Sequence, residues 1–203
     1  RNKIVVVSNM YLDFDKYKID KKFENRKPLV GFISRLDEGK GIMDFVNAIP
    51  LILRERSDAE FLIGGNGSLF NKIRNELDDK KLCNKVLLTG WIAHDLIPST
   101  LNELQLLLLP SYSEGTPNII SESMACGVVV LATSVGGIPD LIIDGKTGFI
   151  LQSNDPQVIA KQVIFALNCP NLAYISINAR KHVQEIYSYE TIVKKFKKLM
   201  DLK

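Results

Sequence analysis

Cysteine and histidine are scarce in this chain of 203 residues, which contains three cysteines and two histidines. Cys83, Cys126 and Cys169 are odd in number and far apart, and no CxxC pair occurs. This spacing excludes a disulfide framework and a Cys/His zinc site, and it predicts reduced thiols in a cytosolic-type protein. Neither His94 nor His182 has a Ser, Cys or Asp at a useful spacing, so a catalytic triad has no support.

Long apolar runs and dense positive charge are also lacking. No run reaches the length of a membrane span, and the first eight residues are too short for a signal peptide. The net charge is +3, and no Arg/Lys stripe with interleaved aromatic residues occurs, so no nucleic-acid partner is expected. The composition instead allows a sizeable core in one large domain or two small ones.

Short apolar runs typical of buried strands alternate with segments of helical periodicity along most of the chain. Such alternation predicts βαβ units, hence an α/β fold with a Rossmann-like parallel sheet and helices on both faces. Pro50 should kink its helix or loosen the last turn. Ile4–Val7 resembles a further strand without a partner, as if the chain had been cut from something longer. The expected strands are 29–33, 59–63, 86–88, 106–109, 128–132 and 148–151, and the expected helices are 41–55, a polar helix ending near 81, 94–103, 117–126, 156–168, 171–186 and 189–202.

The segment 111–127 lies between two of these strands and contains one helix with clear boundaries. Thr116 is expected to cap it, Pro117 suits its first position, and Gly127 suits the turn beyond its end. Its first turn carries no acidic residue, so its free N–H groups and positive dipole end are available to a phosphate. Glu114 and Glu122 frame that turn and could accept hydrogen bonds from the hydroxyls of a sugar.

Two alternatives apply to these glutamates. They could be the acid–base pair of a glycoside hydrolase, but such carboxyls must face each other across the bond. Here Glu114 precedes the helix and Glu122 lies within it, on the same side as the proposed anion site. Glu122 could also be an ordinary surface residue of the helix, which the sequence leaves open.

Other candidates also directly follow strands, where ligands bind in parallel sheets. Arg35 and Lys40 lie on one loop and could converge on a diphosphate, or they could be ordinary surface charges. The glycines of 64–67 either permit close ligand approach or form a plain tight turn. Trp91 could lie against a base, although a lone tryptophan more often packs in a core.

The remaining polar features have simpler interpretations. Asp13 and Asp15 spell the metal-binding pattern DxD, but they lie in a charged connector where such pairs arise by chance. We expect His94 to cap or solvate the short helix after Trp91, and His182 to lie at the surface. Residues 134–140 are expected to form a flexible loop. The basic last helix could touch an acidic membrane surface or be simply solvated.

Together these segments resemble the C-terminal domain of the family 4 glycosyltransferases, retaining enzymes of the GT-B fold. The most specific part is Glu114-Gly-Thr-Pro-Asn-Ile-Ile-Ser-Glu122, which is similar to the family's E-x7-E motif. Residues 132–140 and 144–149 are similar to the stretches that follow it, and Arg35 and Lys40 match the family's pyrophosphate-binding pair. The chain departs from the family pattern at four positions, which are Ser34, Gln105, Val128 and Asp140.

The resemblance implies roles for individual residues. Glu114, Arg35 and Lys40 would be catalytic, with Glu114 holding hydroxyls of the donor sugar. Glu122 would accept a hydrogen bond from the ribose of the nucleotide. The remaining donor-binding positions would be Gly65, Trp91, Ile92, Gly115, Thr116, Pro117, Asn118 and Ile119.

The resemblance further implies that the chain is the C-terminal half of a GT-B enzyme that transfers a sugar from a UDP- or GDP-linked donor. Residues 1–27 would cross between domains, 28–186 would bind the nucleotide sugar, and 187–203 would pack back towards an absent N-terminal domain. That domain would bring the acceptor glycan or lipid. No metal or other cofactor is expected, and the enzyme would be cytoplasmic, with a peripheral contact at the inner face of the membrane left open. Alternatives are a sugar-nucleotide epimerase-like protein and a non-catalytic nucleotide-sugar-binding module.

Overall fold

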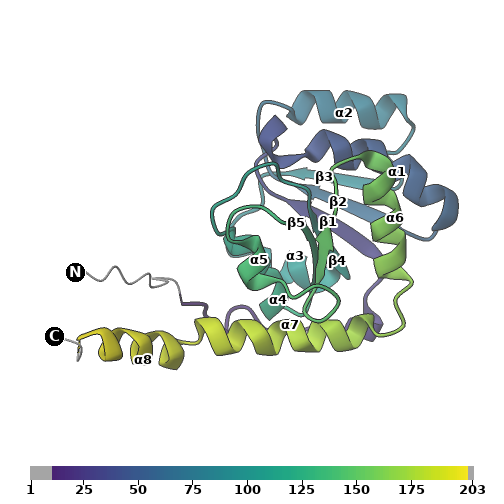
Figure 1. Cartoon of the computed structure of the whole chain (residues 1–203). Helices are drawn as coiled ribbons and strands as arrows, with labels where there is room; N and C mark the ends of the chain where they lie inside the picture. Colours follow the sequence, from purple (N-terminus) through teal and green to yellow (C-terminus); the bar gives the residue numbers. More distant parts are fainter. Residues whose placement is uncertain (1–10, 201–203) are drawn as a thin grey trace.

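The computed structural model describes residues 11–200 and shows a parallel sheet covered by helices on both faces (Figure 1). Within that range the sheet has six strands in the order β3-β2-β1-β4-β5-β6, all paired in parallel. The predicted Rossmann-like α/β fold is therefore confirmed. The strands are β1 (Leu29–Ile33), β2 (Glu60–Gly64), β3 (Val86–Gly90), β4 (Leu106–Leu109), β5 (Val129–Thr133) and β6 (Phe149–Leu151).

The helices alternate with these strands. Their bounds are α1 (Ile42–Glu55), α2 (Phe70–Asp79), α3 (Ile97–Glu103), α4 (Asn118–Ala125), α5 (Ile138–Leu141), α6 (Pro156–Leu167), α7 (Leu172–Tyr187) and α8 (Tyr189–Met200), with 3-10 turns at η1 (Phe23–Asn25) and η2 (Glu38–Lys40). The suggested strand at 4–7 and the last predicted helical residues, 201 and 202, lie outside the described residues.

Each face of the sheet has its own hydrophobic core. Successive residues of a strand point to opposite faces, so Leu106 and Leu108 enter the core under α1, α2 and α6. Leu107 and Leu109 enter the core under α3, α4, α5 and α7. Burial of one such leucine stabilises the fold by about 1.5–3 kcal/mol. The short apolar runs were therefore the correct signal for strands buried on both faces.

The predicted helix at 41–55 is observed as α1, which continues through Pro50 to Glu55, with Ile49 and Ile52 fully buried on either side of the proline. One local prediction was wrong. The segment 134–140 is not only a flexible loop, since Ile138 begins α5 and buries its side chain completely in the second core.

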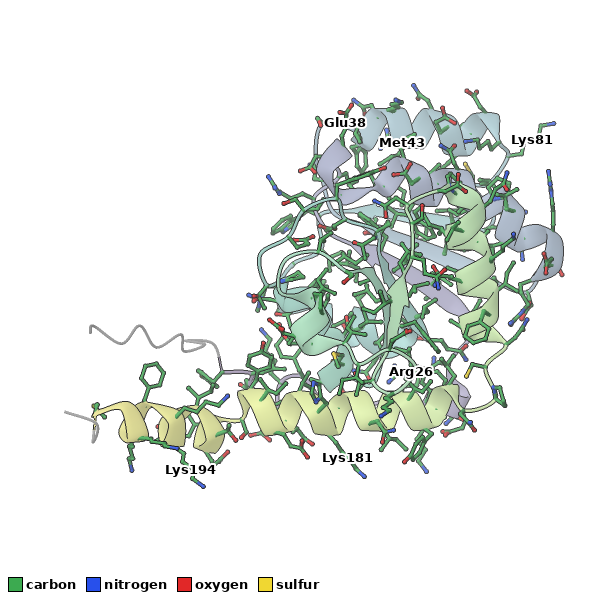
Figure 2. The ribbon with its side chains drawn as sticks, in the orientation of Figure 1. Arg26, Glu38, Met43, Lys81, Lys181 and Lys194 are labelled. Carbon is green, nitrogen blue, oxygen red and sulfur yellow. The ribbon has the colours of Figure 1, made fainter. Side chains whose placement is uncertain are left out.

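The last two helices run beneath the domain. α7 packs against α4, and α8 continues beyond the body of the domain (Figure 1). Lys181 and Lys194 project from the side that faces away from the body (Figure 2). In the part of the chain that the structure describes, no single helix is both long and apolar enough to cross a membrane, and α6 with the α7–α8 segment meets that test only as a bent pair.

Candidate functional site

The loops that follow β1, β2, β3 and β4 all emerge at the carboxyl edge of the sheet, because the strands are parallel. β1 and β4 are neighbours at the centre, and the chain proceeds outward from them in opposite directions. Such a reversal of strand order is where ligands bind in open α/β sheets. The topology thus assembles segments that are more than seventy positions apart in the sequence.

Lys40 and Glu114 form a nearly buried ion pair at this edge. Lys40 Nζ lies 2.8 Å from Glu114 Oε1, and the exposed fractions of the two side chains are 15% and 8%. The hydroxyl of Ser111 donates to the same Oε1 at 2.7 Å. The loops that carry the pair are fixed to each other, because Tyr112 N donates to Gly39 O and Gly41 leaves no room for a Cβ beside Pro110 O. A lysine and a carboxylate are therefore held in place at the edge of the sheet.

The start of α4 lies next to this pair along the chain. The helix begins at Asn118, with Pro117 extended at φ −73° and ψ 117° as the capping residue. No side chain caps the helix, and its first turn contains no acidic residue. The predicted cap at Thr116 and the predicted first helical position at Pro117 were both wrong. The loop before the helix is held against residues 136–137, because Gly137 N donates to Gly115 O. The helix start is nevertheless suited to an anion.

A cavity of about 310 Å³ opens beside α4, between the loops that follow β1, β2 and β3. Trp91 is 77% exposed at its rim, so packing of this tryptophan in the core was the wrong interpretation. The predicted site residues that line the cavity are Arg35, Gly65, Trp91, Ile92, Asn118, Ile119 and Glu122. Glu114, Gly115, Thr116 and Pro117 lie in the loop that leads to α4, and Lys40 reaches that loop through Glu114.

Gly65 is required by the close approach of two loops at this cavity. Its φ is +132°, and a Cβ there would lie 1.8 Å from Ser34 O. Its N–H donates to Gly90 O at 2.7 Å, which ties the ends of β2 and β3 together. The glycine therefore shapes the wall that also carries Arg35.

Arg35 is placed differently from Lys40. Its side chain is 77% exposed and lies 3.6 Å from Asp37. It shares the cavity wall with Asn118 and Ile119, the first residues of α4, while Lys40 lies beside Glu114. Arg35 thus shares a cavity with the start of α4, whereas Lys40 contacts the loop that precedes this helix.

Glu122 has a partner that the sequence did not reveal. The Tyr17 hydroxyl donates to Glu122 Oε1 at 2.9 Å, and the Tyr17 ring is almost completely buried. Burial, together with the negative charge of Glu122, raises the pKa of Tyr17 well above its ordinary value of 10.0. Because 105 positions separate the two residues, no local pattern pointed to this contact. The interpretation of Glu122 as an ordinary surface residue does not hold.

Of the two alternatives for His94, the cap is not observed, because no side chain caps α3. The His94 side chain is instead 71% exposed, with Nδ1 2.8 Å from Lys16 Nζ and Nε2 4.0 Å from Glu122. His182 is only partly exposed, and its Nε2 is buried without a hydrogen-bond partner among the described residues. In the DxD segment, Asp13 accepts from the backbone N–H groups of Asp15 and Lys16 and so closes a local turn.

Residues 13–182 match the family described as glycosyl transferases, group 1. The chain belongs to this family. It is 27% identical to the capsular polysaccharide biosynthesis glycosyltransferase CapM of Staphylococcus aureus, covering 94% of this chain and 53% of CapM. It is 31% identical to the N-acetyl-alpha-D-glucosaminyl L-malate synthase of Bacillus anthracis, covering 92% of this chain and 49% of that enzyme. The chain thus spans about half the length of the curated relatives it matches.

Solved glycosyltransferase structures share the fold. Anabaena HepE in complex with UDP and glucose superposes with a TM-score of 0.82 at 21% identity, covering 95% of this chain and 56% of HepE. The C-terminal domain of the Francisella tularensis group 1 glycosyl transferase LpcC superposes with a TM-score of 0.78 at 21% identity, covering 88% of this chain and 99% of that domain. This chain therefore has the Rossmann-like α/β fold of a domain found in GT-B glycosyltransferases.

Proposed function

We propose that this chain is the donor-binding domain of a retaining, family 4 glycosyltransferase. In this proposal residues 28–186 bind a UDP- or GDP-linked sugar, and residues 1–27 and 187–203 connect the domain to an N-terminal partner domain that brings the acceptor. Coverage of about half of CapM and almost all of the LpcC C-terminal domain supports this division. CapM is named for capsular polysaccharide biosynthesis, which supports a glycan acceptor.

The observation that carries the proposal is the ion pair of Lys40 and Glu114 at the uncapped start of α4, next to the cavity that contains Glu122. A nucleotide sugar presents a base and ribose, a diphosphate, and a sugar with several hydroxyls. Trp91, Ile92 and Glu122 line the cavity and would contact the base and ribose. The start of α4, Arg35 and Lys40 would provide positive charge for the diphosphate, and Glu114 would accept hydrogen bonds from the sugar hydroxyls.

The proposed reaction breaks the bond between the anomeric carbon and the diphosphate oxygen, which keeps the electron pair. The acceptor hydroxyl forms the new bond on the face that the diphosphate leaves, and its proton passes to the departing phosphate oxygen. Arg35, Lys40 and the dipole of α4 would stabilise the charge that grows on the diphosphate. Because these groups would compensate the negative charge on the diphosphate, the proposal requires no metal.

The relatives supply further support. A TarM structure from S. aureus that contains UDP superposes with a TM-score of 0.76 at 25% identity, covering 98% of this chain. The HepE structure also contains UDP, whereas nothing here favours an epimerase. UDP is therefore the first nucleotide to test.

A thermal melt with UDP, GDP and ADP tests the proposal. One nucleoside diphosphate should raise the melting temperature, since a ligand at a hundred times its dissociation constant adds about 2.7 kcal/mol to the free energy of unfolding. Arg35→Ala should weaken binding by about 1.5–3 kcal/mol through the loss of charge-assisted bonds. Arg54→Ala, at an exposed position at the other end of α1, is the matched control and should bind as the parent does. If no nucleotide shifts the melt, or if Arg35→Ala binds like the parent, the proposal fails.

A further inference from the structure

A second and larger cavity, of about 530 Å³, opens over the ends of β4, β5 and β6. It shares no lining residue with the cavity beside α4. Most of its lining residues carry a hydroxyl, amide or carboxylate group, and they come mainly from the loops after the three strands and from the start of α1. Its charged lining residues are two carboxylates, Asp44 and Asp155, and this charge opposes the binding of phosphate or any other anion.

Tyr112 provides an aromatic face at this cavity. Its side chain is 57% exposed, yet its orientation is fixed because the hydroxyl donates to Asp44 Oδ2 at 3.0 Å. This hydrogen bond raises the pKa of the tyrosine, and the neighbouring Asn154 side chain opposes part of the rise. An exposed aromatic ring held in place by its polar end offers a rigid surface to the C–H face of a ligand.

The side-chain oxygen of Asn154 is a hydrogen-bond acceptor that has no donor among the described residues. Its Oδ1 is buried and takes no hydrogen bond from any residue between 11 and 200. The loop around it is well anchored, since Gln152 N donates to Gln162 Oε1 and Asp155 accepts from the first N–H groups of α6. A buried carbonyl oxygen without a partner is costly, and a turn of the Asn154 side chain towards the cavity that it lines would let a ligand hydroxyl donate to this oxygen.

We propose that this cavity binds an uncharged saccharide. A sugar ring has an apolar C–H face that suits Tyr112, and hydroxyls that can donate to Asn154, Asp44 and Ser153. Ser111 lines this cavity and also donates to Glu114, so the saccharide would lie just beyond the Lys40–Glu114 pair. The site is separate from the proposed donor site, and neither proposal depends on the other.

Amide chemical shifts of the ¹⁵N-labelled chain, titrated with maltotriose, cellotriose, mannotriose and chitotriose, test this inference. At least one trisaccharide should shift the amides of 133–135 and 152–155. Tyr112→Ala should weaken that binding at least about tenfold, because the stacking surface is lost. Tyr174→Ala removes a tyrosine that is 65% exposed on α7 and should leave the affinity unchanged. Asn154→Ala is a second variant and should weaken binding without removing the ring.

The inference is overturned if none of the four sugars shifts these amides, or if Tyr112→Ala and Asn154→Ala both bind like the parent. Titration with UDP separates this result from the fate of the donor site. UDP should shift the amides of 64–66, 91–92 and 118–122 and leave those of 152–155 in place. Either ligand can therefore fail while the other succeeds.

Discussion

At the scale of single residues, the Lys40–Glu114 ion pair costs free energy of desolvation but holds the loop before α4 in place. Both side chains are largely removed from water, and Ser111 satisfies part of the carboxylate. Removal of either charge is strongly destabilising, because the remaining charge would be buried without a counter-charge and without water. The pair therefore fixes the geometry of the loop before α4 whether or not a ligand is bound.

Lys40→Met should lower the free energy of unfolding by about 3–5 kcal/mol, because it leaves the Glu114 carboxylate buried without a counter-charge. Lys40→Met combined with Glu114→Gln should recover much of this loss, since the neutral amide can still accept from Ser111. Urea unfolding of the parent, both single variants and the double variant measures the coupling. A cost below about 1 kcal/mol for Lys40→Met would show that the pair behaves as an exposed surface ion pair.

Tyr17 gives a second prediction at this scale. Its folded pKa is raised, so above the ordinary value of 10.0 the unfolded chain loses this proton before the folded chain does. The contribution of Tyr17 to the free energy of unfolding is therefore fully present at neutral pH, and it decreases as the pH rises above about 10. Tyr17→Phe should lower the free energy of unfolding by about 1.5–3 kcal/mol at neutral pH. It should also reduce the fall of this free energy between about pH 9 and pH 11, because the variant has no hydroxyl to ionise.

Urea midpoints across that pH range provide the measurement. Tyr174→Phe, on an exposed ring, serves as the control and should follow the parent curve. An alkaline slope in Tyr17→Phe as steep as that of the parent would show that the Tyr17–Glu122 contact is not maintained in solution. The slope should not vanish entirely, because burial also raises the pKa of Tyr187.

At the scale of elements, Arg26 ties the segment before β1 to the ends of two helices. Figure 2 labels it just above α7, on the inner side of the domain. Its guanidinium is buried and donates to carbonyl groups at the carboxyl ends of α3 and α4, namely those of Leu104, Cys126 and Gly127. Burial lowers the pKa of this group, and the carbonyls at the two helix ends compensate the buried charge.

Arg26→Met should lower the free energy of unfolding by more than about 3 kcal/mol, because several buried carbonyls lose their donor together. Arg26→Lys should recover only part, since an ammonium cannot reproduce the planar fork of the guanidinium. Arg54→Met, at an exposed position of α1, is the control. Thermal unfolding and amide exchange in α4 measure the effect, and an Arg26→Met protein as stable as the control would contradict the role given to this residue.

The elements themselves were largely predictable. Runs such as 106–109 are continuous and apolar because both faces of the sheet are covered, and β4 has the bounds that the run predicts. Capping was less predictable, because the loop at 115–117 is held by Gly137, which follows the next strand. α5 was missed because a helix of four residues has too few positions to show a period.

At the scale of the whole molecule, the parallel sheet is what brings the site together. β1 lies beside β4, so a loop that follows residue 33 meets one that follows residue 109. The sequence predicted which residues follow strands, and a shared edge then brings them near each other. It did not predict Tyr17 as the partner of Glu122, because that contact depends on the tertiary arrangement. The contact of Ser111 with Glu114 spans only three residues and was missed although it is local. The roles of the site residues remain predictions.

A crystal structure of this chain with UDP, or with whichever nucleoside diphosphate raises the melting temperature, tests the central claim most directly. The account predicts the diphosphate at the first turn of α4, between Arg35 and Lys40, with the base beside Trp91 and the ribose within hydrogen-bonding reach of Glu122. A nucleotide bound elsewhere on the domain, or one whose diphosphate lies away from the start of α4, would contradict it.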